Sequence, residues 1–366
     1  MKGYQFEDTQ GTFHLKKAEN ISYLYFPIAG EAGLKSSFTP NLGGDAKIDQ
    51  NTFLLEPVSA ENLVNNRNSR NFWCNVKGIG SWSLTGHSAE ELSKKFTEMQ
   101  DDSEVTAGFM WQKTTRESKK YQLRGEILSF IPVDKNVEIM LVTITNTGRM
   151  AQTVTPTAAI PLYGRSADNI RDHRHVTSLL HRIETTDTGV LVTPTLSFDE
   201  RGHQVNHMTY YCVGWSGNGE KPVDFYPTAE DFVGEGGNFE RPYAIVKNAE
   251  GVKAGTKIEG LEAVGGLHFS EITLEPEEEC SYLIFTGITE DIQEIRNLSK
   301  TYTTREKVLE ELEKTKAYWQ EKVNVAYHTG DSDFNQFMHW VSFQPILRRI
   351  YGLSLIHISE PTRRVV

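Results

Sequence analysis

A repeating β signal from the N-terminus to about residue 286 is the feature that most constrains the fold. Segments rich in β-branched and aromatic residues, which strands favour, lie at residues 23–27, 105–111, 121–131, 137–145, 152–160, 189–198, 208–216, 267–274 and 280–286. Turn residues separate several of them. Because many strands with few helices between them favour antiparallel sheets packed face to face, the sequence predicts a mainly β sandwich over residues 1–286.

The hydrophobic period becomes helical after Gly287. Two helices are expected, over residues 289–298 and from a capping-box pattern at 303–306 to about residue 323. Their apolar faces comprise Ile292, Ile295 and Leu298, and then Val308, Leu312, Trp319 and Val323. One short helix is expected earlier, behind a capping box at residues 88–91, with Leu92 and Phe96 four positions apart. Residues 287–325 are therefore interpreted as a helical linker of fixed geometry.

A third helix is expected from about Ser332, and apolar side chains surround it on nearly all sides. Such a helix needs burial in a bundle or barrel, yet no partner helices follow it. We therefore expect residues 326–352 to begin a further, truncated domain. Residues 353–366 resemble a translated sequencing adapter, and we expect them to be an artefact outside the fold. A genuine polar tail is the alternative.

Composition excludes some classes of protein. A net charge of −11 without a basic stripe disfavours a nucleic-acid partner. The apolar runs are too short to cross a membrane, and no secretory h-region opens the chain. Three cysteines without metal-type spacing indicate reduced thiols. We therefore expect a cytoplasmic protein.

One loop carries an unusual density of charged side chains. Residues 165–182, RSADNIRDHRHVTSLLHR, join two apolar segments and hold four arginines, two aspartates and three histidines. Ordinary connections need only turn residues. Arginines and carboxylates in one loop suit either a self-paired structural knot or the recognition of a hydroxyl-rich or anionic ligand. Residue chemistry alone favours the knot, because neighbouring Arg and Asp side chains commonly satisfy each other.

Other candidate sites are weaker. His173 and His175 would share one face of a strand, but no further ligands with matching spacing support a metal site. The glycine-rich stretch 234–237 lacks the residues of a phosphate loop and is better explained as a turn with positive φ. Stacking on sugar rings is one possible role for Trp73, Trp82 and Trp215, although tryptophans in a sandwich more commonly pack in the core. No complete catalytic set can be chosen from the residues alone.

The central loop also resembles a family motif. It is similar to the segment RSADNxRDHRxVTSLL of glycoside hydrolase family 94, the inverting glycoside phosphorylases of the cellobiose phosphorylase type. Weaker similarities run from about residue 20 to Gly352 and include 71–73, 105–108, 130–132 and 232–237. The segment 344–352 looks like the first barrel helix of a branch that differs from the cellobiose-acting enzymes.

The resemblance implies a galactose mutarotase-like super-β-sandwich, a helical linker and then an (α/α)6 catalytic barrel. It also implies cleavage of a β-glucosidic bond in a disaccharide or oligosaccharide by inorganic phosphate, with inversion, giving a sugar 1-phosphate in a homodimeric enzyme. Phosphate is a co-substrate, and no cofactor or metal is implied. In the family, the catalytic Asp and the phosphate-binding residues lie in the barrel, beyond Gly352. We therefore expect this chain to be inactive by itself, and the β-1,4, β-1,3 or β-1,2 linkage stays open.

The resemblance points to the central loop as the local segment that reaches substrate. It implies Arg171 and Arg174 as donors to sugar hydroxyls, with His173 beside them and Asp168 and Asp172 orienting them. The structural knot stays open as the alternative for this loop. A second functional interpretation is a stand-alone carbohydrate-binding or dimer-assembly module without catalysis.

Overall fold

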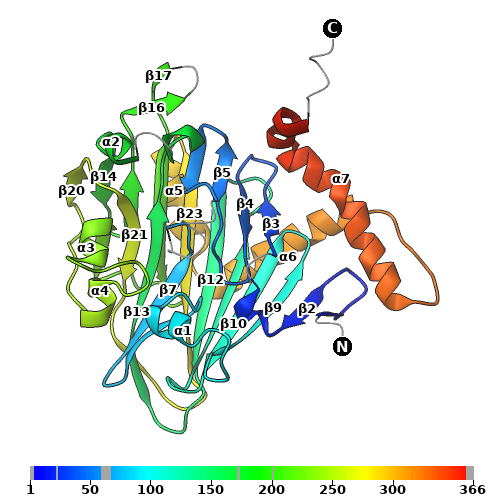
Figure 1. The fold of residues 1–366 in the computed structure, drawn as a ribbon, viewed down its shortest axis with the longest axis horizontal. Helices are drawn as coiled ribbons and strands as arrows, with labels where there is room; N and C mark the ends of the chain where they lie inside the picture. The colour runs from blue at the N-terminus through cyan, green and yellow to red at the C-terminus, as the bar shows by residue number, and fades with distance from the viewer. Residues whose placement is uncertain (1–3, 22–23, 59–66, 171–173, 200–201, 360–366) are drawn as a thin grey trace.

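Two large antiparallel sheets form most of the molecule (Figure 1). The computed structural model describes residues 4–21, 24–58, 67–170, 174–199 and 202–359. Within these residues the larger sheet has eleven strands, in the spatial order β1 (Tyr4–Phe6), β2 (Phe13–Lys16), β9 (Asp102–Gly108), β10 (Trp111–Ser118), β11 (Leu123–Phe130), β12 (Val137–Asn146), β23 (Glu279–Thr289), β18 (Thr209–Ser216), β15 (Gly189–Val192), β14 (Arg182–Thr185) and β20 (Lys257–Glu259).

The second sheet faces the larger one. Its described strands are β19 (Asp224–Thr228), β21 (Ala263–His268), β13 (Gln152–Leu162), β7 (Asn71–Val76) and β8 (Gly80–Ser83), with β22 (Ile272–Leu274) paired to β13. A smaller sheet contains β3 (Phe26–Ala29), β4 (Lys35–Phe38), β5 (Ala46–Asp49) and β6 (Thr52–Leu55), and a separate hairpin contains β16 (Leu196–Asp199) and β17 (Gly202–Val205). The predicted mainly β, antiparallel fold is confirmed.

The central strand β12 explains how the layers are arranged. All ten of its residues are buried, and they alternate between two cores. The inner core, between the sheets, receives Met140, Val142 and Ile144. The outer core receives Val137, Ile139 and Leu141. A strand buried on both faces reads as a mostly apolar run, and residues 139–142 of this strand are all apolar.

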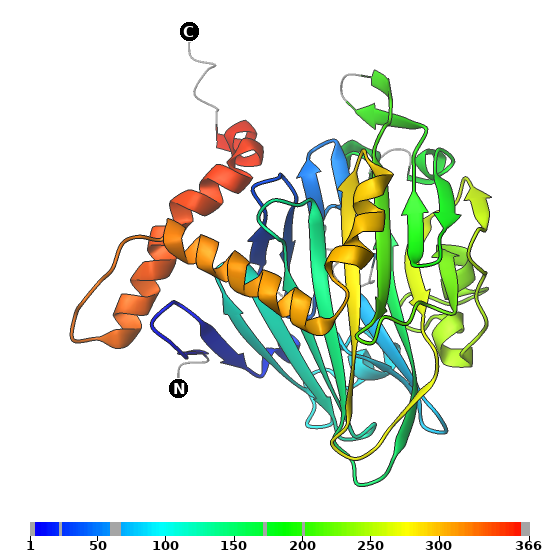
Figure 2. The same cartoon turned by 180° about the vertical axis from the view of Figure 1, so that it is seen from behind.

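Two helices, α5 (Ile292–Thr301) and α6 (Arg305–Lys322), cover the outer face of the larger sheet (Figure 2). Their buried residues in the outer core are Ile295, Leu298, Val308 and Leu312. This confirms the two predicted helices and most of their apolar faces, although Ile292 is 43% exposed. The second capping box is wrong, because the cap residue is Thr304 and its side chain makes no capping bond.

The last helix, α7 (Ser332–Ser359), rests with one face on the sandwich and on the end of α6. Phe343 is fully buried against Phe109, Met110 and Trp319. Trp340 Nε1 donates to the carbonyl of Gly11 at 2.8 Å. The expectation that no element of this chain covers the helix is therefore wrong for one face. The helix also continues into the segment that we expected to lie outside the fold; residues 360–366 lie outside the described part.

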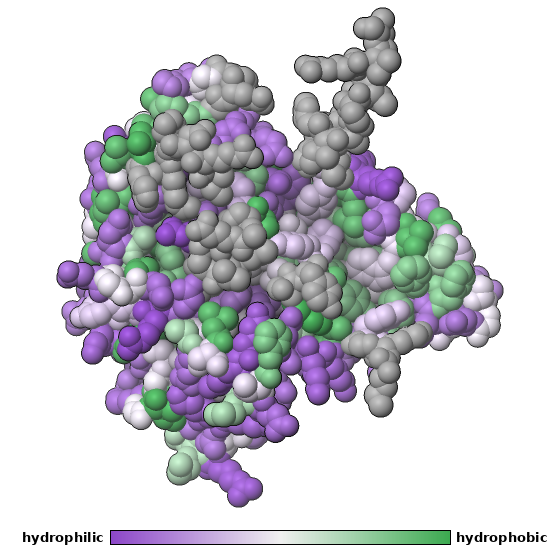
Figure 3. All heavy atoms as spheres, viewed as in Figure 1, coloured by the Kyte–Doolittle hydropathy of each residue, from purple (hydrophilic) through white to green (hydrophobic). Residues whose placement is uncertain are grey.

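The other face of α7 remains apolar and exposed. Phe334, Phe337 and Val341 are 46%, 54% and 42% exposed. Figure 3 shows apolar surface gathered over this helix. Because these residues recur at intervals of three and four, they share one side of the helix.

The remaining helices are short. They are η1 (Ala18–Asn20), α1 (Ala89–Ser93), η2 (Ala167–Ile170), α2 (Arg174–Ser178), α3 (Ala229–Val233) and α4 (Tyr243–Lys247). The capping box of α1 is confirmed for its first half, because Ser88 Oγ accepts from the Glu91 amide at 3.1 Å. Phe96, expected on its apolar face, is instead 76% exposed. Helices α3 and α4 cover the outer face of the second sheet (Figure 1).

Three predicted strands have wrong boundaries. The segment 105–111 is broken by a turn at Phe109 and Met110, where Met110 has a φ of 63°, and Trp111 begins β10. The segment 189–198 contains parts of two strands, β15 and β16, and 267–274 spans the end of β21 and all of β22. In each case an apolar run continues across a turn, so composition alone did not show where one strand ends and the next begins.

Candidate functional site

The charged loop of residues 165–182 connects the second sheet to an edge of the larger one. It leaves β13 and enters β14, and it contains η2 and α2. Its start is bonded to the β5–β6 hairpin, since the amide of Phe53 donates to the carbonyl of Arg165 at 3.0 Å and the amide of Ala167 donates to the carbonyl of Gln50 at 2.9 Å. The backbone of the loop is thus held where it leaves the sheet.

Arg165 is the buried centre of this loop, with 4% of its surface exposed. Its Nε donates to His181 Nε2 at 3.2 Å, its Nη1 to Thr177 Oγ1 at 3.3 Å, and its Nη2 to Glu262 Oε2 at 2.5 Å. The guanidinium carbon also lies 4.8 Å from the ring centre of Tyr163. These contacts tie both ends of the loop to the strand β21 region, as a structural knot requires. We call Arg165, Thr177, His181 and Glu262 the loop network.

His181 is a neutral hydrogen-bonding link in this network. Its Nδ1 lies 3.2 Å from the carbonyl of Leu261 and therefore carries the proton, while its Nε2 accepts from Arg165. Burial, and next the nearby Arg165 charge, lower the pKa of His181 from 6.5 to about 3. Both ring nitrogens are used within the protein, so this histidine is not a free metal ligand.

The outer part of the loop is fastened to the β16–β17 hairpin, which projects beside it in Figure 1. Ser166 Oγ donates to the carbonyl of Phe198 at 2.6 Å, and Asn169 Nδ2 donates to the same carbonyl at 2.8 Å. The rings of Phe198 and His203 pack at a centroid distance of 4.1 Å. Loop and hairpin therefore form one surface unit.

Of the predicted ligand-binding residues, only the side chain of Asp168 is described. Asp168 is exposed in η2. Arg171, Asp172 and His173 lie outside the described residues, as does the side chain of Arg174, which begins α2. The helical start at Arg174 does not fit the strand geometry on which the His173 and His175 metal hypothesis depended. The role of these residues in sugar binding stays a prediction.

A cavity of about 20 Å³ adjoins the loop network. Its lining includes Tyr163, Glu262, Glu56, Arg67 and Phe239. A volume of this size holds about one water molecule and is far below what a sugar ring needs. This cavity is therefore too small to be a sugar site.

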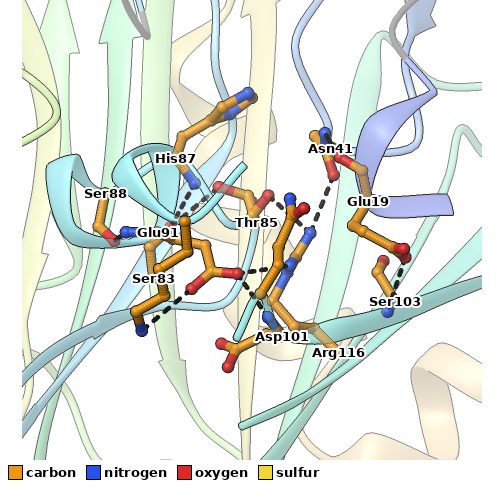
Figure 4. A network of polar contacts seen from close by, with 12 residues as sticks. Glu19, Asn41, Ser83, Thr85, His87, Ser88, Glu91, Asp101, Ser103 and Arg116 are labelled. Atoms are coloured by element: carbon orange, nitrogen blue, oxygen red, sulfur yellow. Dashed lines mark hydrogen bonds and ion pairs between the residues drawn. The ribbon is translucent and has the colours of Figure 1, made fainter. Parts of the chain in front are cut away.

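A second buried charge cluster, which the sequence did not single out, lies between β10 and α1 (Figure 4). Arg116 is 1% exposed. Its Nη2 donates to Asn41 Oδ1 at 3.0 Å and to the carbonyl of Thr85 at 3.3 Å. Its Nη1 lies 3.9 Å from Glu91 Oε1, which instead accepts from the amide of Asp101 at 2.6 Å. Burial, and next the Asp101 charge, raise the pKa of Glu91.

A third buried pair lies between β12 and β7. Arg70 and Glu138 form an ion pair in which both side chains are fully buried. Ser36 Oγ donates to Glu138 at 2.6 Å, and Arg70 also donates to the carbonyl of Gly44 at 2.9 Å. The sequence signal for this pair is a charged residue within or beside a mostly apolar strand.

The remaining sequence hypotheses can be judged directly. Core packing is confirmed for Trp73, Trp82 and Trp215, which are 2%, 2% and 4% exposed. The turn at residues 234–237 is confirmed, since Gly234 ends α3 with a φ of 72° and Gly236 has a φ of 70°. All three cysteines are free thiols.

Neither a metal-ligand cluster nor a membrane-spanning helix occurs among the described residues. They contain no group of three or more His, Cys, Asp or Glu placed to hold a metal ion. Every helix among them is too short or too polar to cross a bilayer.

Comparisons with solved structures show distant likeness. A protein described as a kojibiose phosphorylase from the human microbiome has 8% identity and a TM-score of 0.45, with 92% of this chain and 41% of that chain covered. A bacterial glucoamylase complexed with acarbose has 9% identity and a TM-score of 0.43, with 93% and 40% covered. A protein described as an aldose 1-epimerase from Escherichia coli K12 has 9% identity and a TM-score of 0.38, with 73% and 99% covered. Scores this low carry no argument about function.

Sequence families give the decisive comparison. The chain spans less than half of the first of these solved proteins, and no curated protein sequence matches it. The family model described as "Glycosyl hydrolase 94, supersandwich domain" matches residues 55–305, which is well over half of the chain. The match covers most of both sheets, the charged loop, and α5. The chain therefore belongs to glycoside hydrolase family 94.

Proposed function

We propose that this chain is the sandwich and linker part of a glycoside phosphorylase that cleaves a β-glucosidic bond with inorganic phosphate and inversion, releasing a sugar 1-phosphate. Membership of glycoside hydrolase family 94 is the observation that carries the proposal. In such an enzyme phosphate takes the place of the water that attacks in an inverting hydrolase, and one carboxylic acid protonates the leaving oxygen. Both functions belong to the barrel in the family, so the chain alone is expected to lack activity.

The test begins with the source DNA beyond the codon for Gly352. A continuing frame that encodes paired barrel helices would support the proposal. The full protein should then release a sugar 1-phosphate from a β-linked glucoside only when phosphate is present. Hydrolysis without phosphate, or a native stop codon after Val366, would contradict it.

For the loop we propose that Arg171 and Arg174 donate hydrogen bonds to sugar hydroxyls, with Asp168, Asp172 and His173 orienting them. The attachment of the described part of the loop at Arg165 and at the hairpin supports this, because a segment held at fixed points loses less conformational entropy when a ligand binds. In the full protein, Arg174→Ala should raise the acceptor KM. The matched control is Arg149→Ala, which removes an exposed arginine from another loop. Unchanged kinetics in Arg174→Ala would remove the ligand role.

A binding or assembly module without catalysis is the second candidate. The packing of α7 on the sandwich favours it in part, because one face of this helix is covered within the chain itself. This candidate predicts that the isolated chain binds β-gluco-oligosaccharides in calorimetry without turning them over. Absence of binding, together with activity of a longer protein, would exclude it.

A further inference from the structure

A cavity of about 410 Å³ lies between α5 and the turn that joins β11 to β12. It adjoins the outer face of the larger sheet, where α5 covers part of that sheet (Figure 2). Its floor contains Val137 of β12, Tyr211 of β18 and Leu298 of α5, all of which belong to the outer core. A cavity of this volume can hold a small ligand, unlike the cavity beside the loop network.

Polar side chains of α5 form one wall of the cavity. Glu294, Asn297 and Thr301 line it, and their spacing of three and four positions places them on one side of the helix. Glu294 is held in position, because its Oε2 accepts from Thr289 Oγ1 at 2.6 Å. A carboxylate accepts several hydrogen bonds, so Glu294 can also accept from a ligand.

Residues 134–136 of the β11–β12 turn form the opposite wall. The β3–β4 turn holds them in place. Oδ1 of Asn136 accepts from the amide of Leu34 at 2.9 Å, and the carbonyl of Val133 accepts from the amide of Glu31 at 2.7 Å. Because both walls are fixed by the fold, a ligand would bind with little loss of conformational entropy in the protein.

Tyr211 brings a buried hydroxyl to this cavity. Its ring crosses Gly287, the residue opposite it on β23, since a Cβ at Gly287 would lie 2.4 Å from Tyr211 Oη. The same Cβ would lie 2.5 Å from the carbonyl oxygen of Asn136, so the hydroxyl lies near the turn that forms the second wall. Burial, and next the Glu294 charge, raise the pKa of Tyr211, which keeps its hydroxyl protonated and able to donate.

We propose that this cavity binds a small neutral molecule rich in hydroxyl groups, such as a single hexose. A hydroxyl group both donates and accepts, and the cavity offers both kinds of partner: Tyr211 donates, Glu294 accepts and the Asn297 amide does both. An anion fits less well, because the lining carries two carboxylates, Asp134 and Glu294, and one ammonium group, Lys135. Binding here requires no catalytic barrel, so it is independent of the proposed phosphorolysis.

Calorimetry and ligand-observed NMR of this chain with D-glucose provide the test. We expect saturable binding with a Kd of about 1 mM, as for a small ligand with few contacts. Asn297→Leu removes the amide at similar side-chain size and should weaken binding about tenfold. Tyr211→Phe, which removes only the hydroxyl, should also weaken it. Ser299→Leu, at an exposed position of α5 outside the cavity lining, is the matched control and should leave the Kd unchanged.

Three outcomes would overturn the proposal. The first is the absence of saturable glucose binding. The second is glucose binding that persists in both Asn297→Leu and Tyr211→Phe; if Arg174→Ala abolishes that binding, the sugar binds the charged loop and not the cavity. The third is stronger binding of ethanolamine than of glucose in the unaltered chain, lost in Glu294→Gln, which would make the cavity a cation site.

Discussion

The loop network and the buried cluster around Arg116 each enclose a buried arginine, but they satisfy its hydrogen-bonding groups differently. In the loop network Nε, Nη1 and Nη2 of Arg165 each donate to a side chain. In the Arg116 cluster only Nη2 of the guanidinium donates to protein atoms among the described residues. The difference teaches that one buried arginine can join several segments through all of its nitrogen atoms, while another is held by the protein at a single nitrogen.

The largest effect is expected from Arg165→Met. This change leaves Glu262 and His181 without their main partner, and removing one member of a largely buried pair costs about 3–5 kcal/mol. Urea unfolding of the chain measures the loss. A decrease in the free energy of unfolding below about 1 kcal/mol is typical of a surface ion pair. Such a small decrease would show that Arg165 does not hold the loop network together.

A pH titration of stability tests the neutral His181. Because its folded pKa is lowered from 6.5 to about 3, the unfolded chain binds the proton first, and stability is lost as pH falls from about 6.5 towards 3. At pH 5 the protonation of His181 in the unfolded chain should have lowered the free energy of unfolding by about 2 kcal/mol. His181→Gln should reduce the pH dependence without abolishing it, because burial also lowers the pKa of His87, to about 4.

The matched control for that titration is His207→Gln, which alters an exposed histidine. It should leave the stability profile unchanged between pH 7 and 5. A profile equally flattened by both variants would contradict the assignment to His181.

Arg116→Met should cost less than Arg165→Met, about 1–2 kcal/mol, because only two protein hydrogen bonds are lost and Glu91 keeps its bond to the Asp101 amide. Urea unfolding under the same conditions gives the comparison. Equal losses in the two variants would show that the number of protein hydrogen bonds does not decide how much a buried arginine stabilises this fold.

The smallest effect expected is a coupling between Gly86 and Arg116. Gly86→Ala introduces strain at a φ of 77° and pushes against the guanidinium. In the Arg116→Met background the clash with the guanidinium disappears and only the backbone strain remains. A double-mutant cycle should therefore give a coupling free energy of about 1 kcal/mol. Strict additivity would mean that the guanidinium moves away freely, although Asn41 and the carbonyl of Thr85 accept hydrogen bonds from it.

Hydrophobic patterning predicted the strands that have a clear apolar face or are buried on both sides, such as β12. It did not predict β10, whose inward residues are polar, because Gln112 and Arg116 read as solvent-facing. It also missed the turn at Met110, where a left-handed residue that is not glycine gives no composition signal. The charged loop was recognised from its density, but only the geometry separates buried Arg165 and His181 from exposed Asp168.

The strand β12 has a further consequence for how the chain folds. Its Val137, Ile139 and Leu141 are covered by α5 and α6. The secondary structure therefore changes from β to α near residue 286, but the strands and the helices on either side of that point share one hydrophobic core. A sandwich cut at that point would expose a broad apolar wall of the larger sheet to solvent. The helices are thus expected to unfold with the sheet in one cooperative transition, and a truncation that removes them should lower solubility before it changes any binding property.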